Sequence, residues 1–252
     1  MSARSGWRPS VGTTSKALGV LVAFCVGVAS VLTPQVAPVM ATAVSMVVFP
    51  FVLNFPFHPE WQIQRRLLHM CTGSLIVFVS HRLEASQSIL HCALFMLTLG
   101  AAVIEVSRRT LESAANLFSF FFGNLLRGDE AAGTRVPGAF YFLPGAGLAL
   151  YLFPVEEARL AILALAFGDP AAGFCGASHS RWNCRLAGKS LFGFVACAGA
   201  TALAVFAYAH IAAVPLPPLL RLSVLSAVAE SLSLVDDNLT MPLFFCILRR
   251  LV

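Results

Sequence analysis

The sequence predicts an all-α fold, a multi-pass bundle of about seven to nine transmembrane helices. Hydrophobic residues make up 58% of the 252 residues and charged residues only 12%, about half of the charged share in a soluble domain. Asp, Glu, Lys and Arg are absent from 17–57 and again from 190–220. A helix crosses a bilayer with about 20 apolar residues, so both stretches are long enough to span one.

The hydrophobic runs give the order of the expected helices, and Pro34 and Pro38 separate the first two because proline interrupts a helix. The apolar segment 114–126 is too short to span a bilayer and is predicted to lie at the membrane interface. The spanning helices are expected at 17–33, 36–55, 66–80, 89–106, 138–154, 158–176, 190–213 and 219–235, with a short apolar tail from Leu239.

The first residues, 1–16, form a basic tail without an acidic residue. The tail is interpreted as cytosolic, and the alternative is a targeting or signal peptide with its apolar core at 18–32. Two accessory transmembrane helices follow in 17–57, and 58–252 form the main membrane domain. A cytosolic N-terminus places the arginine-rich loops and the polar clusters on the cytosolic face. The net charge of +5 then faces anionic headgroups rather than nucleic acid.

Asp169 and Lys189 are charged residues in a part of the chain that otherwise avoids charge. Asp169 follows an unbroken hydrophobic run, and Lys189, one of two lysines, precedes Ser190 at the start of a long helix. A carboxylate beside a glycine-rich turn suits a divalent cation that carries phosphates. A lysine at a helix N-terminus favours a phosphate group. We predict a phosphate site here; the alternatives are an interfacial acid that ends a helix and a lysine that serves the positive-inside rule.

Two further pairs of charged residues lie at helix ends. Arg65 and Arg66 begin the third helix, where they are either a stop-transfer charge pair or a clamp for phosphate. Glu105 and Arg108 are three positions apart on one helix and therefore face each other. A structural ion pair is the default interpretation of this second pair.

Three consecutive side chains with oxygen atoms, Asp236, Asp237 and Asn238, follow an apolar helix. They form either a capped turn or a site for a metal ion or an acceptor hydroxyl group. Glu230 lies upstream, inside the apolar helix, and is expected to pair with an arginine. His69 is a single histidine on an apolar segment and is expected to be a hydrogen-bonded core residue.

The order of these motifs resembles the CTP-dependent lipid kinases. That family includes dolichol kinase, phytol kinase and the CTP-dependent diacylglycerol kinase of the endoplasmic reticulum, and it is related in fold to the phosphatidate cytidylyltransferases. The resemblance lies in Arg65-Arg66-x-x-His69, in Asp169-x-x-Ala-x-x-x-Gly176, and in Lys189-Ser190-x-x-Gly193. The Asp-Asp-Asn-Leu-Thr-x-Pro ending is most similar to the diacylglycerol kinase branch. Arg66, Pro170, Phe192 and Phe194 depart from the residues that are common in the family.

The resemblance implies an enzyme that moves the γ-phosphate of CTP to a lipid alcohol, with diacylglycerol as the first choice and phosphatidate as the product. It implies a divalent cation, Mg²⁺ or Ca²⁺, at Asp169, and makes residues 58–252 the catalytic domain. The implied site consists of catalytic Asp169, Lys189, Arg65 and Arg66, nucleotide-binding Gly173, Gly176, Lys189, Ser190 and Gly193, and a second polar or lipid cluster of Glu105, Arg108, Asp236, Asp237 and Asn238.

Three other functions are alternatives. A dolichol or phytol kinase would differ only in its acceptor lipid. A phosphatidate cytidylyltransferase would attack a different phosphorus, but the chain lacks the His-Gly-Gly-x-x-Asp-Arg-x-Asp signature of that activity. An ion-coupled transporter would use Glu105, Asp169 and Glu230 as intramembrane acids, although no inverted repeat relates the halves. The expected location is the endoplasmic reticulum membrane, with the site facing the cytosol.

Overall fold

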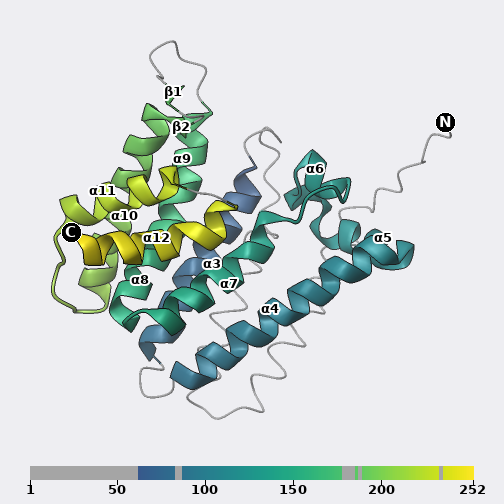
Figure 1. Ribbon diagram of the computed structural model, residues 1–252, viewed down its shortest axis with the longest axis horizontal. Helices are drawn as coiled ribbons and strands as arrows, with labels where there is room; N and C mark the ends of the chain where they lie inside the picture. Colours follow the sequence, from purple (N-terminus) through teal and green to yellow (C-terminus); the bar gives the residue numbers. More distant parts are fainter. Residues whose placement is uncertain (1–61, 83–86, 178–184, 187–188, 233–234) are drawn as a thin grey trace. The chain divides into compact units, whose positions relative to one another are not determined.

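The computed structural model describes residues 62–82, 87–177, 185–186, 189–232 and 235–252. These residues are mostly helical, as the sequence predicts (Figure 1). The N-terminal tail and the two accessory helices expected at 17–33 and 36–55 lie outside the described residues.

The described residues belong to two compact units, which are considered separately. The described part of the first unit is Val103–Pro137, and the second unit takes its residues from Phe57–Ala102 and Gly138–Val252. The sequence places all of these residues in one domain, 58–252. The hydrophobic pattern therefore does not predict that Val103–Pro137 belongs to a different compact unit from the rest of 58–252.

The second unit is a set of helices packed around one central helical segment. This segment consists of α8 (Val155–Leu163), a π-helical turn η4 (Ala164–Gly168) and α9 (Asp169–Gly176), which follow each other without a break. Its residues from 158 to 166 are all buried, because neighbouring helices pack against η4 from several sides. Those neighbours are α3 (Ile63–Arg82), α10 (Leu191–Ile211), α11 (Leu219–Ser231) and α12 (Asp237–Leu251).

Three helices in the described part of the chain are long and apolar enough to cross a membrane. They are α4 (Gln87–Thr110), the central segment Val155–Gly176, and α10. The helix α7 (Gly138–Leu152) is apolar but shorter. Within α4, the large side chains of Phe95 and Met96 are more than half exposed, as expected for a helix with lipid contact.

The region around Lys189 differs from the all-α prediction. Arg185–Leu186 (β1) and Lys189–Ser190 (β2) form a two-residue antiparallel ladder. Lys189 and Ser190 therefore precede α10 instead of opening it, and Ser190 is the N-cap whose Oγ accepts a hydrogen bond from the Gly193 N–H at 3.0 Å. The helix therefore starts one residue later than predicted, at Leu191, and it follows a short ladder that the sequence does not predict.

The C-terminal end of the chain also differs from the prediction. The helix expected at 219–235 ends at Ser231, and the apolar tail expected from Leu239 is a full helix, α12, which begins at Asp237. The side chain of Asp236 caps α12 by accepting a hydrogen bond from the Asn238 N–H at 3.1 Å. This capping confirms that Asp236 belongs to a capped turn.

The described part of the first unit contains the end of α4, then α5 (Glu112–Phe122), η3 (Gly123–Leu125) and α6 (Gly128–Ala131). The helix α5 overlaps the segment 114–126, for which a short interfacial helix is expected, but begins two residues before it. The side chain of Leu117 is more than half exposed. The expected ion pair between Glu105 and Arg108 is present and buried.

Candidate functional site

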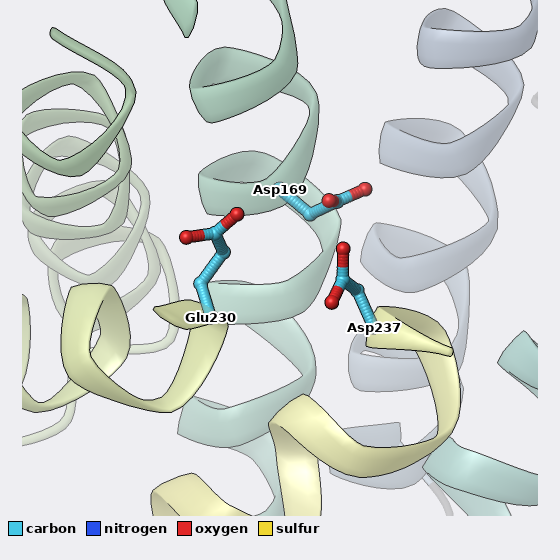
Figure 2. Close-up of side chains that lie close together, drawn as sticks. All are labelled: Asp169, Glu230 and Asp237. Carbon is cyan, nitrogen blue, oxygen red and sulfur yellow. The ribbon is translucent and has the colours of Figure 1, made fainter. Parts of the chain in front are cut away.

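Three carboxylates from separate helices of the second unit lie close together. Asp169 begins α9, Glu230 lies in the last turn of α11, and Asp237 begins α12. One carboxylate oxygen from each residue lies within 4.8 Å of the other two, and Figure 2 shows the three side chains around a common space. Carboxylates this close repel each other unless a cation lies among them.

Lys189 supplies such a cation. Its Nζ donates to Glu230 Oε1 at 2.7 Å and to Asp237 Oδ2 at 3.3 Å. Burial lowers the pKa of Lys189, but the hydrogen bonds and negative charges of Glu230 and Asp237 raise the pKa by more, so the net shift is upward. Lys189 is therefore held as an ammonium group at the acidic cluster. The structure thus brings Lys189 to the same cluster as Asp169.

The position of Asp169 follows from the helix that carries it. The π-helical turn Ala164–Gly168 ends directly before Asp169, and Pro170 follows. Proline has no N–H to donate to the preceding turn. Pro170 is therefore a local cause of the departure from regular α-helical hydrogen bonding before Asp169. Single π turns of this kind are frequent at functional sites.

Two side chains of α3 reach this part of the central segment. His69 Nε2 donates to the Leu165 carbonyl at 3.2 Å and lies 3.9 Å from Asp169 Oδ2. Arg66 Nη1 donates to the Pro170 carbonyl at 2.7 Å. The bond to Leu165 confirms His69 as a hydrogen-bonded core residue, and the contact with Asp169 adds a neighbour that the sequence does not predict.

The candidate nucleotide-binding glycines pack against Ser190 and Arg66. A Cβ atom on Gly176 would lie 2.9 Å from Ser190 Oγ, and one on Gly193 would lie at the same distance from that oxygen. A Cβ atom on Gly173 would lie 3.4 Å from Nη2 of Arg66. At Gly193 a Cβ atom would also lie 3.0 Å from the Ala172 carbonyl oxygen, a backbone atom, so a glycine suits this position best. The structure therefore brings all of these candidates together around the start of α10 and the end of α9.

Arg65, Asp236 and Asn238 surround the start of α7. A Cβ atom on Gly138 would lie 2.7 Å from Arg65 Nη2, 2.9 Å from Asn238 Nδ2 and 3.6 Å from Asp236 Oδ2. Asn238 Nδ2 donates to the Gly138 carbonyl at 2.8 Å. Asp236 caps α12, as described above, so these residues tie α3, α7 and α12 together beside the acidic cluster.

Glu105 and Arg108 belong to the first compact unit, whereas Asp236, Asp237 and Asn238 belong to the second. Arg108 is buried and donates to both carboxylate oxygens of Glu105, to the Glu130 carbonyl and to the Arg135 carbonyl. Arg109 is a second partner of Glu105. These contacts form a hydrogen-bond network that connects the end of α4 to Glu130 and Arg135, which follow it in the chain.

Glu230 is the member of the acidic cluster for which the sequence prediction is wrong. Its expected partner was an arginine, whereas the structure pairs it with Lys189. An acid inside an apolar helix was the available signal, but the partner lies 41 positions away in the chain. Lys189 balances only one of the three negative charges of the cluster, so the three carboxylates together remain a candidate site for a divalent cation, with Asp169 as one of its ligands.

No family model, no curated protein and no solved structure matches this chain. The resemblance to the CTP-dependent lipid kinases therefore stays a prediction that rests on the motifs.

Proposed function

We propose that the protein is a membrane phosphotransferase that moves the γ-phosphate of CTP to a lipid alcohol, with diacylglycerol as substrate and phosphatidate as product. The single observation that carries the proposal is the meeting of Lys189 and Asp169 in one cluster. Phosphoryl transfer needs mainly positioning and neutralisation of charge. The cluster offers groups of both signs for these tasks.

Each residue around the cluster has its own role in the proposed reaction. The ammonium of Lys189 and the N–H groups at the start of α10 bind phosphate oxygens. Arg66, which the Pro170 carbonyl holds near Gly173, and Arg65 stabilise the charge on the transferring group. A divalent cation at Asp169 would neutralise the phosphate oxygens of the nucleotide. Gly176 and Gly193 allow the end of α9 and the start of α10 to pack closely around Ser190.

The proposed acceptor reaches the site from the lipid. Three helices in the described ranges are long and apolar enough to span a membrane, and the central one carries Asp169 seven residues before its end. This distance along an α-helix is about 10 Å. A lipid hydroxyl group that enters between helices therefore meets Asp169 without leaving the membrane border. The proposed location is the endoplasmic reticulum membrane, with the site on the cytosolic face.

Replacement of Asp169 by Asn tests the proposal. The purified protein in mixed micelles is incubated with CTP labelled at the γ-phosphate, Mg²⁺ and a panel of diacylglycerol, dolichol and phytol. We expect label in phosphatidate with the parent protein and a loss of at least about 100-fold in the Asp169→Asn variant. The matched control is Asp129→Asn, an exposed acid of the other unit, which should keep full activity.

The nucleotide product separates the proposed reaction from cytidylyl transfer. Release of CDP identifies a kinase, and release of pyrophosphate with phosphatidate as acceptor identifies a cytidylyltransferase. Full transfer of label by the Asp169→Asn variant would remove the proposed role of this carboxylate.

A further inference from the structure

The two carboxylates that bind Lys189 differ in their surroundings. The Glu230 side chain is 8% exposed and lies 2.7 Å from Nζ, whereas the Asp237 side chain is 32% exposed and lies 3.3 Å from it. The lysine itself is 35% exposed. The ammonium group therefore has one buried partner and one partner that solvent reaches.

Lys189 is the charged partner of the buried Glu230 side chain. Glu230 lies in the last turn of α11, where the neighbouring Ser226, Ala227 and Ala229 are buried. A buried carboxylate is costly unless it is paired, and the ion pair that the described residues give to Glu230 is the one with Lys189. A pair between partly exposed groups, such as Lys189 with Asp237, contributes little and exchanges readily with solvent. The contact with Glu230 is thus the strong one.

We infer that Glu230 is a positioning residue that anchors Lys189, while Asp237 holds the place on the ammonium that a phosphate oxygen takes. The first half of this inference stands on the geometry alone. The second half rests on the proposed function. It predicts that a phosphate group displaces the Asp237 contact and leaves the Glu230 contact in place.

The other groups around the ammonium are consistent with this division. Asp169 from α9 completes the acidic cluster, and His69 from α3 lies beside Asp169 at 3.9 Å. Among the described residues near the cluster, Glu230 alone combines burial with a direct bond to Lys189.

Chemical labelling of the lysine tests the anchor directly. The chain has two lysines, Lys16 and Lys189, so a Lys16→Arg background leaves one lysine side chain to follow by peptide mass spectrometry. The rate of labelling by an amine-reactive ester is measured at mildly alkaline pH on the folded protein in detergent, without nucleotide. Glu230→Gln and Asp237→Asn are compared in this background. The matched control is Glu157→Gln, whose carboxylate pairs with Arg250.

We expect Glu230→Gln to label about tenfold faster than the background protein, because a charge-assisted bond to a buried carboxylate is lost. Asp237→Asn should label at most about threefold faster, and Glu157→Gln should label at the background rate. Equal rates for the Glu230→Gln and background proteins would overturn the anchor. If Glu230→Gln does not fold, Glu230→Asp gives the same comparison, because the shorter side chain keeps the charge but retracts from Nζ.

CTP with Mg²⁺ tests the second half of the inference. Nucleotide should slow the labelling of Lys189, and Glu230→Gln should raise the KM for CTP about tenfold while kcat changes less. A purely structural role would instead lower the active fraction and leave the KM unchanged. If CTP neither protects Lys189 nor supports turnover, the proposed function fails, whereas the anchor is judged by the rates measured without nucleotide.

Discussion

The contact between α7 and α12 predicts a large effect from one added methyl group. A Cβ atom on Gly145 would lie 2.1 Å from the Asn238 carbonyl oxygen and 3.0 Å from the Leu239 Cα atom. Both are backbone atoms, so no side-chain rotation relieves the overlap. Ordinary contact begins at 3.4 Å, so Gly145→Ala must displace the start of α12 by about 1.3 Å.

This displacement has a stability cost and a functional cost. Overpacking of a well-packed contact typically costs about 1–3 kcal/mol, and alanine recovers about 0.5–1 kcal/mol relative to glycine in a helix. We expect a net loss of about 1 kcal/mol for Gly145→Ala. Asp237 moves with the start of α12, and a misplacement of about 1 Å at a catalytic site costs on the order of 100-fold in rate.

The matched control lies two positions further along the same helix. A Cβ atom on Gly147 would lie 3.6 Å from Leu94 Cβ, an ordinary contact, so Gly147→Ala should be neutral or slightly stabilising. The assays are the free energy of unfolding in detergent, from denaturant titration, and the transfer of label from CTP to diacylglycerol. Equal stability of Gly145→Ala and Gly147→Ala would refute the close packing of α7 against α12.

Three further predictions concern buried charges. Lys189→Met leaves the buried Glu230 carboxylate without its ion-pair partner and should lower the free energy of unfolding by about 2 kcal/mol. The double variant Lys189→Met with Glu230→Gln should recover most of that loss in the same denaturant titration. The pKa of Lys189 is raised above its ordinary value of 10.5, so its stabilising contribution is fully present below pH 10.5 and is lost as the pH rises through the raised value; the stability difference between the parent and Lys189→Met should shrink there. Arg159 is fully buried and donates to Ser80 Oγ at 3.0 Å and to the Ser80 carbonyl at 2.6 Å, so Arg159→Met should cost about 3 kcal/mol in thermal or denaturant unfolding.

The hydrophobic pattern predicts the long helices well, because burial and lipid contact both require uninterrupted apolar residues. The helix expected at 138–154 is observed as Gly138–Leu152, and the one expected at 190–213 as Leu191–Ile211. The helix α12 was expected only as a short tail from Leu239. Its Pro242 and the charged pair Arg249 and Arg250 disguise a helix that other contacts stabilise, among them the ion pair of Arg250 with Glu157.

The candidate site was partly visible in the sequence because charge is rare in this chain. Asp169 and Lys189 could be selected for that reason, and the structure brings them to one cluster. The partner of Glu230 could not be selected, since the pairing depends on how α11 approaches β2 in space. The distance of 3.9 Å between His69 and Asp169 was equally hidden, because it depends on the packing of α3 against the central segment.

The π-helical turn before Asp169 determines the direction in which this carboxylate points from the helix axis. Each residue of an α-helix turns the chain by about 100° around its axis, and a π turn holds one residue more than the regular ladder needs. If Ala164–Gly168 became a regular α-helix at unchanged length, the extra residue would no longer be absorbed and Asp169 would swing by about that angle, away from Glu230 and Asp237. Substitutions that favour regular α-helical hydrogen bonding in this turn should therefore turn the acid away from the cluster, whereas removal of the one extra residue should leave its direction nearly unchanged.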